Sequence, residues 1–292
     1  MTTRGRKPRP GRIMFVGSGP GDPALLTTRA ATVLANAPLV FIDPDVPEPV
    51  LALIGKDLPP VSGPAEPSAQ SENGATEGTA GAGTDEQPAA VVSVGPDIRP
   101  ALGDPAEVAK TLVAEARTGT DVVRLVAGDP LSVDSVITEV NTVARTHLHF
   151  EVVPGLAASS AVPTYAGLPL GSSHTVADVR DPHVDWAALA AAPGPLILQA
   201  TSSHVADAAR TLIEYGLADT TPCVVTCSGT TCAQRSVEST LGGLTDSAVQ
   251  LGLDPAAPAP VVVTIGKTVH NRAKLNWWES RALYGWTVLV PR

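Results

Sequence analysis

The segment RIMFVGSGPGDPALL, residues 12–26, decides the fold of this chain. Its apolar beginning, Ile13–Val16, predicts a buried strand. Three glycines follow in the next five positions and allow a tight turn that brings backbone N–H groups close to a ligand. Asp22 is placed to cap a helix that begins at Pro23. The helix has apolar residues on one face: Leu26, Ala30, Val33 and Leu34. Strand, glycine turn and helix together indicate the ligand loop of an α/β domain.

The chemistry of this loop argues against a phosphate ligand. A dinucleotide-binding loop needs G-x-G-x-x-G, and Asp22 stands where the last glycine would be. A nucleotide-binding P-loop ends in G-K-[S/T], and no such sequence follows. A carboxylate at the start of the helix also repels phosphate. The loop therefore predicts a ligand without phosphates, although an ordinary strand-to-helix turn fits the loop by itself equally well.

Composition narrows the class of protein. A length of 292 residues predicts about two domains. The formal net charge of −9 argues against a nucleic-acid binder, and no apolar run is long enough to span a membrane. The basic beginning, residues 1–11, lacks the apolar core of a secretory signal and is predicted to be a flexible tail. The three cysteines (Cys223, Cys227 and Cys232) match no zinc-ligand spacing, so we expect thiols in a reducing cytoplasm and no metal site.

The first half of the chain alternates predicted strands and helices. Further strands are expected at Leu39–Ile42, Val122–Leu125 and Phe150–Val153, with helices from Asp104 to Gly119 and over Val133–Ala144. Residues 59–99 are rich in Pro, Gly, Ala, Ser, Glu and Thr and offer almost nothing to bury. We expect them to be a disordered insertion that splits one domain.

Several predicted strands end in small residues or a carboxylate. The glycine turn 17–22 follows the first strand, Ala127–Pro130 another, and Pro154–Gly155 a third, while Asp43 follows Leu39–Ile42. In a parallel sheet the carboxyl ends of the strands share one edge, where α/β proteins bind their ligands. Taken singly, each turn is compatible with ordinary loop chemistry, and Asp43 alone with a turn residue. Together they predict a binding site at this edge.

The second half repeats the pattern with different details. Strands are predicted at Pro195–Gln199, Pro222–Cys227 and Val261–Ile265, with a returning antiparallel strand over 234–238. Helices are predicted from a cap at Ser203 to Tyr215, and over Leu241–Gln250. The predicted organisation is an N-terminal α/β domain over 12–168 and a C-terminal α/β domain over 169–276.

In this order, the motifs resemble those of the tetrapyrrole (corrin/porphyrin) methylase family, and within it the uroporphyrinogen-III C-methyltransferases. The matching sequences are VGSGPGD (16–22) with LLT (25–27), VRL (123–125) with GDP (128–130), VVPG (152–155) with YAG (165–167) and PL (169–170), and GTT (229–231) with QR (234–235). Any one of these motifs is weak, whereas the ordered set is specific. Residues 277–292 resemble a linker and the first strand of uroporphyrinogen-III synthase, so we expect the N-terminal part of a fusion with that enzyme.

The resemblance implies a fold, a cofactor and a reaction. It implies two α/β domains of the tetrapyrrole-methylase type with the active site in the cleft between them, and a homodimer. It implies that S-adenosylmethionine donates methyl groups to uroporphyrinogen III, giving precorrin-2 for sirohaem and cobalamin. Asp43 would be the catalytic proton acceptor, with Arg124, His174 and Arg235 as substrate contacts. The implied cofactor contacts are Pro20, Ala127, Gly128, Asp129, Ser132, Ala157, Ala158, Ala200 and Gly229.

The chain also departs from the family pattern. After its third strand the family has a lysine that is expected to act as an acid, and this chain has Pro60–Pro64 there instead. The family's Thr-His-Arg is replaced by Gly171–Ser173, and the methionine on its cofactor side is replaced by Ala200. The family's Phe-Gly-Arg-Gly-Gly becomes Val133–Ile137. These changes fall mainly in substrate-binding loops, for which arginine is the natural carboxylate ligand. Two other functions therefore stay open: a weakly active or non-catalytic module that binds S-adenosylmethionine or a tetrapyrrole beside a fused synthase, and a methylase of a different tetrapyrrole.

Overall fold

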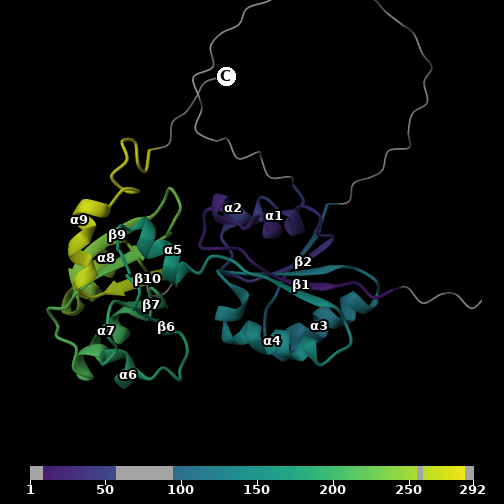
Figure 1. Ribbon diagram of the computed structural model, residues 1–292, viewed down its shortest axis with the longest axis horizontal. Coiled ribbons are helices and arrows are strands. Elements are labelled where there is room, and N and C mark those ends of the chain that lie inside the picture. The colour runs from purple at the N-terminus through teal and green to yellow at the C-terminus, as the bar shows by residue number, and fades with distance from the viewer. Residues whose placement is uncertain (1–8, 57–94, 255–258, 287–292) are drawn as a thin grey trace, which may run out of the picture.

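Two five-stranded sheets form the two lobes of the protein (Figure 1). The computed structural model describes residues 9–56, 95–254 and 259–286. The sheet of the first lobe consists of β1 (Ile13–Gly17), β2 (Leu39–Ile42), β3 (Asp97–Pro100), β4 (Val122–Val126) and β5 (Phe150–Val153). Its strand order is β3-β2-β4-β1-β5, and every neighbouring pair is parallel. The predicted α/β class is confirmed.

Helices cover both faces of the first sheet. α1 (Thr28–Ala35) and α2 (Glu48–Leu51) lie on one face, and α3 (Pro105–Arg117) and α4 (Asp134–Ala144) lie on the other (Figure 1). Alternate residues of β1 serve the two cores: Met14 and Val16 pack with α1 and α2, and Ile13 and Phe15 pack with α3 and α4. A strand buried on both faces has to be apolar at every position, which explains the unbroken apolar run in the sequence.

The start of the first helix differs from the prediction. Asp22 accepts a hydrogen bond from the Ala24 N–H and caps only a short 3-10 turn, Pro23–Leu25. The α-helix α1 begins one turn later, where the Thr27 hydroxyl accepts from the Ala30 N–H. Both residues are good caps, and the chain uses them in succession. The predicted cap at Asp104 is confirmed, because its carboxylate accepts from the N–H groups of the first turn of α3.

The predicted insertion is wrong at its C-terminal end. Residues 97–99 belong to β3, an edge strand that pairs in parallel with β2, and the Asp97 N–H donates to the Pro38 carbonyl. Its residues are mostly exposed, so the sequence offers little apolar signal there. The predicted insertion over residues 59–94 and the predicted tail over residues 1–8 lie outside the described residues.

The second sheet is mixed. It contains β6 (Thr175–Asp178), β7 (Leu196–Thr201), β8 (Pro222–Cys227), β9 (Arg235–Thr240) and β10 (Pro260–Ile265), in the order β6-β7-β10-β8-β9. Only β6 and β7 are parallel, and β9 returns antiparallel to β8 as predicted. One face packs against α6 (Trp186–Ala190), α7 (Val205–Glu214) and α8 (Leu244–Gln250). Ser203 does not cap α7, whose N-cap is His204 without a side-chain bond.

The other face of the second sheet is covered by α5 (Ala158–Tyr165), and the short helix α9 (Arg272–Leu275) follows the last strand. Val162 of α5 packs with Ile197 of β7 and Val262 of β10. This packing favours a boundary between the lobes before Ala158, earlier than residue 168, and the domain limits stay a proposal. Residues 277–284 were predicted to be part of a linker, but their side chains pack and hydrogen-bond onto the second lobe.

Candidate functional site

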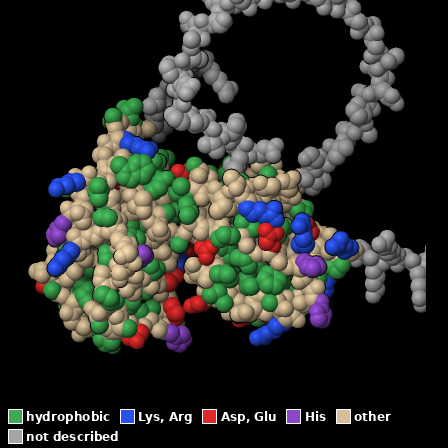
Figure 2. All heavy atoms as spheres, viewed as in Figure 1, with side chains coloured by type: hydrophobic (Ala, Val, Ile, Leu, Met, Phe, Trp, Pro, Cys, Tyr) green, Lys and Arg blue, Asp and Glu red, His purple; other side chains and the backbone are tan. Residues whose placement is uncertain are grey.

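A pocket of about 810 Å³ lies between the two lobes. The first lobe contributes the loops after β1, β2 and β4, and the second lobe contributes α5, the ends of β7, β8 and β10, and the loop after β8. This volume is within the roughly 300–1,000 Å³ usual for small-molecule sites. Figure 2 shows acidic side chains gathered where the lobes meet. The pocket stands at the carboxyl edge of the parallel sheet, where the ends of the strands were predicted to form a site.

Glycines bring the three predicted loops into direct contact. A Cβ added to Gly17 would lie 2.5 Å from the Gly128 carbonyl oxygen, and one added to Gly155 would lie 2.1 Å from the same oxygen. Gly19 and Gly128 exchange backbone hydrogen bonds of 3.2 and 3.1 Å. The prediction that these turns share one edge is confirmed. Gly17 and Gly155 serve loop packing, because any side chain there would collide with backbone.

Other glycines present bare backbone to the cavity. Gly19 and Gly128 both have φ of +71°, a left-handed conformation that glycine adopts without strain. A Cβ added to Gly128 would meet nothing within 4 Å, and one added to Gly19 would meet only ordinary contacts. No lysine lines the pocket among the residues that the structure describes. These features suit a ligand recognised by backbone groups, and they do not suit a phosphate held by ammonium groups.

The structure brings together all the residues predicted to contact the cofactor, from five separate stretches of chain. They line the pocket as follows: Pro20; Ala127, Gly128, Asp129 and Ser132; Ala157 and Ala158; Ala200; and Gly229. Two of them also hold the loops, because the Asp129 carboxylate accepts from the Gly155 N–H at 3.1 Å and from the Ser132 hydroxyl at 3.1 Å. Their contact with a cofactor stays a prediction.

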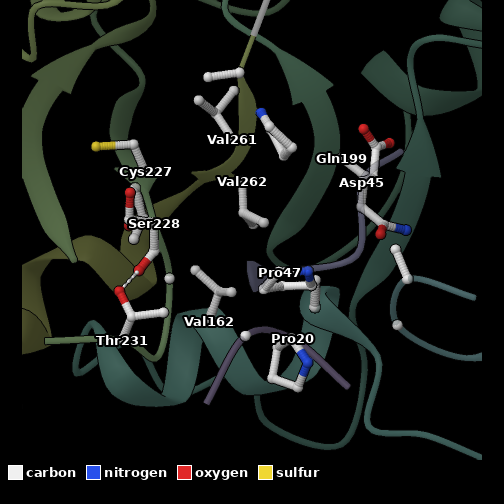
Figure 3. A pocket seen from close by; sticks show the side chains of 18 of the residues that line it. Pro20, Asp45, Pro47, Val162, Gln199, Cys227, Ser228, Thr231, Val261 and Val262 are labelled. Carbon is white, nitrogen blue, oxygen red and sulfur yellow. Dashed lines mark hydrogen bonds between the residues drawn. The ribbon is translucent and has the colours of Figure 1, made fainter. Parts of the chain in front are cut away.

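The second lobe supplies an apolar wall with polar edges. Figure 3 shows Val162 and Val262 around the middle of the pocket, with Pro20 and Pro47 of the first lobe near them. Gln199 and Asp45 lie on one side, and Ser228 and Thr231 on the other, where the Thr231 hydroxyl donates to the Ser228 carbonyl at 2.7 Å. Such a mixture fits an organic ligand with a flat apolar part and a few polar groups.

The loop after β8, residues 228–234, has an unusual backbone. Ser228 and Thr230 have φ of +49° and +66°, in the left-handed region that side chains disfavour. Each such residue costs on the order of 1 kcal/mol and persists only where surrounding contacts enforce it. Gly229 between them leaves no room for a side chain, because an added Cβ would lie 2.4 Å from Val162 Cγ2. The Asp22 N–H donates to the Thr230 hydroxyl at 3.2 Å, which joins this loop to the first lobe.

A buried ion triad lies beneath the loop after β4. Arg124 is 2% exposed and donates to Glu139 of α4 at 2.8 and 2.9 Å and to Asp43 at 2.5 Å. Burial by itself lowers the pKa of Arg124, but the hydrogen bonds to Glu139 and the charge of Asp43 more than offset it, so the pKa is raised. Burial raises the pKa of Glu139, which Arg124 offsets only in part. The structure contradicts the prediction that Arg124 contacts substrate, because the buried guanidinium already donates to Glu139, Asp43 and the Leu125 carbonyl.

Asp43 lies at the end of β2, as predicted, but it has protein partners. Besides its ion pair with Arg124, its second oxygen accepts from the Ala127 N–H at 3.4 Å. Its side chain keeps 19% of its surface exposed, and it is not among the residues that line the pocket. The carboxylate therefore anchors the Ala127 loop, and its role as a proton acceptor stays a prediction.

The two other predicted substrate residues differ in position. Arg235 lines the pocket. His174 is exposed, precedes β6 and is not among the residues that line the pocket, whereas Asp178 at the opposite end of that strand lines it, so the position of His174 does not support a substrate contact. The local sequence around His174 does not indicate which end of β6 lies at the pocket.

Sequence reasoning left Arg180 without a role, but the structure places it in the pocket wall. Its guanidinium donates to Asp178 of its own lobe at 2.6 Å and to Asp45 of the first lobe at 2.9 Å. Among the described residues this is the ion pair that joins the two lobes. Asp45 and Arg180 are separated by 135 positions, so no local pattern identifies their pairing.

Two other kinds of feature are absent from the described residues. No three His, Cys, Asp or Glu side chains gather there as metal ligands. No helix in that part of the chain has the length and hydropathy needed to cross a membrane.

Comparisons with known proteins agree with this geometry. The family model "Tetrapyrrole (Corrin/Porphyrin) Methylases" matches residues 12–245. Siroheme synthase 2 of Serratia proteamaculans is 29% identical over 279 residues, covering 93% of this chain and 52% of the relative. The chain thus spans about half the length of the curated relatives it matches.

Solved structures share the fold. Uroporphyrin-III C-methyltransferase from Thermus thermophilus, solved with S-adenosylhomocysteine, matches with a TM-score of 0.65 at 23% identity, over 89% of this chain and 99% of the other. A cobalt precorrin-4 methyltransferase matches with a TM-score of 0.65 at 20% identity, over 88% of this chain and 95% of the other. The expected two-domain methylase architecture is confirmed.

The ion triad gives a prediction for stability. Replacing Glu139 by alanine leaves the buried Arg124 with one carboxylate, and we expect the free energy of unfolding to fall by about 3–5 kcal/mol. Glu107→Ala is the matched control, because Glu107 pairs with Lys110 on the exposed face of α3 and should change stability by less than about 1 kcal/mol. Urea unfolding measures both. Equal effects of the two substitutions would show that the triad does not stabilise the first lobe.

Proposed function

The chain belongs to the tetrapyrrole (corrin/porphyrin) methylase family, and from that premise we propose that it is an S-adenosylmethionine-dependent C-methyltransferase that converts uroporphyrinogen III to precorrin-2. The observation that carries this proposal is the interlobe pocket. Five stretches of chain named in advance as cofactor contacts line it together. An unrelated fold of the same composition would not be expected to bring these five stretches together in one cavity.

The pocket fits S-adenosylmethionine in its charge and its lining. The cofactor has no phosphate, which agrees with the absence of lysine from the described lining and with the bare backbone of Gly19 and Gly128. Its sulfonium and ammonium groups are positive, and three carboxylates line the cavity: Asp129, which accepts from Gly155 and Ser132, and Asp45 and Asp178, which share Arg180. Pro20, Ala158 and Gly229 are small enough for the adenosine and methionine parts to lie against backbone.

Methyl transfer requires few catalytic side chains. When bound, S-adenosylmethionine supplies an electrophilic methyl group. The pocket would hold a pyrrole carbon of the substrate in line with that group and exclude water, and such positioning supplies much of the rate of a bimolecular step. A carboxylate then accepts the proton that the methylated macrocycle releases as its double bonds rearrange. We propose Asp43 for this role, acting through the oxygen that faces Ala127 and not the one that Arg124 holds.

Arginines at the pocket are the proposed ligands of the substrate. Uroporphyrinogen III carries several carboxylates, and guanidinium groups bind carboxylates through paired hydrogen bonds. Arg180 and Arg235 line the pocket, whereas Arg124 is buried beneath it. Arg180 is shared between Asp178 and Asp45, of which Asp45 is the more exposed partner. A substrate carboxylate would replace Asp45 at this guanidinium.

Two alternatives rest on the altered substrate loops. Loss of the family's lysine and of its Thr-His-Arg favours a weakly active or non-catalytic binding module. The substitution of the same loops equally favours a methylase of a different tetrapyrrole, since the family's cofactor loops are kept. Homodimerisation, a cytoplasmic location and a fused synthase domain are further proposals that follow from the family resemblance.

Binding and turnover separate these readings. Calorimetric titration with S-adenosylhomocysteine should show one site per chain. An anaerobic assay with enzymatically generated uroporphyrinogen III should then yield products heavier by one and by two methyl groups. Binding without methylation would support the module, and methylation of only a later intermediate would support the other methylase. Absence of S-adenosylhomocysteine binding would refute all three.

Asp43→Asn tests the proton acceptor. Asparagine keeps the size of the side chain, and its single carbonyl oxygen can still accept from Arg124, but its amide group cannot accept from the Ala127 N–H, so S-adenosylhomocysteine affinity should fall by no more than about fivefold. Methyl transfer should fall by about a hundredfold if the carboxylate accepts the proton. Asp207→Asn on the exposed surface of α7 is the control and should not change turnover. Unchanged turnover of Asp43→Asn would remove Asp43 from the mechanism.

Arg180 and Asp45 give a test that depends on the sign of the effect. Arg180→Gln should raise KM for uroporphyrinogen III by about tenfold because a carboxylate ligand is lost. Asp45→Asn should lower KM by about twofold because it removes a competing carboxylate from an exposed pair. Steady-state kinetics measures both. If the pair only holds the lobes together, both substitutions should change KM in the same direction.

A further inference from the structure

The pocket loop 228–234 is held in a conformation that its own sequence disfavours. Ser228 and Thr230 have positive φ angles, and neither is glycine. Ser228, Gly229 and Thr231 all line the pocket, so the conformation of this loop shapes the wall of the proposed cofactor site. Strained backbone persists where neighbouring structure enforces it, and besides Asp22 and Val162 this loop has contacts with residues that do not line the pocket.

Those contacts come from residues 276–284, which we call the C-terminal strap. The indole N–H of Trp278 donates to the Thr231 carbonyl at 3.1 Å. The Tyr284 hydroxyl donates to the Gln234 carbonyl at 2.5 Å. Burial raises the pKa of Tyr284 to about 12, so the hydroxyl keeps its proton and remains a donor at neutral pH. Two strap side chains thus bind the backbone of the pocket loop directly.

A third strap residue acts through Gln234. Glu279, whose side chain is 11% exposed, accepts from Gln234 Nε2 at 2.8 Å and from the Ser236 hydroxyl at 2.6 Å, and it pairs with Arg272 at 2.5 Å. The other end of the Gln234 amide accepts from the Thr230 N–H at 2.7 Å. Gln234 is fully buried. A continuous set of hydrogen bonds therefore runs from Glu279 to the strained Thr230, whose hydroxyl in turn binds the Asp22 N–H of the first lobe.

Aromatic packing fixes the strap against the lobe. The ring of Trp278 lies 4.7 Å from that of Tyr165 at the end of α5, in an edge-on arrangement, and 6.3 Å from that of Tyr284. The Arg281 guanidinium lies 4.0 Å from the centre of the Trp278 ring, a cation–π distance. These contacts leave Trp278 little freedom, so its N–H is aimed at Thr231 before any ligand binds.

We propose that the C-terminal strap positions the loop 228–234 for S-adenosylmethionine, with Trp278, Tyr284 and Glu279 as positioning residues. The inference rests on the proposed function, because it takes this pocket as the cofactor site. None of these three side chains lines the pocket, so each acts through the loop. By keeping Gly229 against Val162 and Thr230 in its strained conformation, the strap lets ligand bind without first ordering the loop.

The double substitution Trp278→Phe with Tyr284→Phe tests the proposal. It removes both hydrogen bonds to the loop backbone while keeping an aromatic ring at each position, a smaller one at position 278. We expect calorimetry to show S-adenosylhomocysteine binding about tenfold weaker than in the wild type, about what two lost hydrogen bonds give. Hydrogen exchange followed by mass spectrometry should show faster exchange in the peptide containing Thr230, with β7 and β10 unchanged. This local effect separates loop release from general destabilisation.

Trp277→Phe is the matched control. Its indole N–H donates to the Thr164 carbonyl of α5 and not to the loop, so affinity should stay within about twofold of the wild type. Equal affinity of the double variant and the wild type would overturn the proposal, and so would equal weakening in the double variant and the control. Failure of the proposed function looks different, because the wild type itself would then bind no S-adenosylhomocysteine. Glu279→Gln adds an independent measurement: it should also speed exchange at Thr230, whereas unchanged exchange would exclude Glu279 from the strap's action.

Discussion

The close approach of three backbone turns is the constraint on which the rest of this structure depends. Gly17 and Gly155 both lie against the Gly128 carbonyl, and an added Cβ at either position would overlap it. This contact is possible because β4, β1 and β5 are adjacent and parallel, so their carboxyl ends finish at one edge. The resulting floor of bare backbone leaves the ligand to be recognised by N–H and C=O groups. Large side chains would only obstruct that floor.

The second lobe completes the pocket in a different way. Its wall is an apolar face of α5 and β10, together with a loop whose backbone is strained at Ser228 and Thr230. The described part of the first lobe avoids strain by using glycine at its left-handed positions, whereas the pocket loop of the second lobe has ordinary residues at two such positions, held by contacts from outside the loop. Gln234 is buried and Glu279 nearly so, and the hydrogen bonds that join them to each other and to Thr230 favour one conformation of the loop. The wall from the first lobe is therefore fixed by its local sequence, and the wall from the second lobe is fixed by residues distant in the sequence.

Charge in the cleft is arranged on two levels. The Asp43–Arg124–Glu139 triad is buried, and it holds the Ala127 loop from beneath. The Asp45–Arg180–Asp178 group is half-exposed and joins the lobes at the pocket wall. A buried pair is costly to break, whereas an exposed pair exchanges partners at little cost in free energy. The buried triad is therefore suited to holding the loop in place, and the half-exposed group is suited to exchanging a partner for a charged substrate.

The sequence by itself determined the α/β class, four of the five strands of the first sheet and the edge where the turns meet, and through the family resemblance it indicated nine of the residues that line the pocket. These follow from local rules: apolar runs, glycine turns, helix caps and an ordered set of motifs. The predictions that failed have a common cause. The sequence did not reveal the burial of Arg124, the position of His174 at the wrong end of β6, the strand within 97–99 or the packing of residues 277–284. Tertiary structure decided these, and also the pairing of Asp45 with Arg180 and the clamp of Glu279 on the pocket loop. Each of these features depends on contacts between residues that are distant in the sequence, and such contacts form only when the chain packs into its tertiary structure.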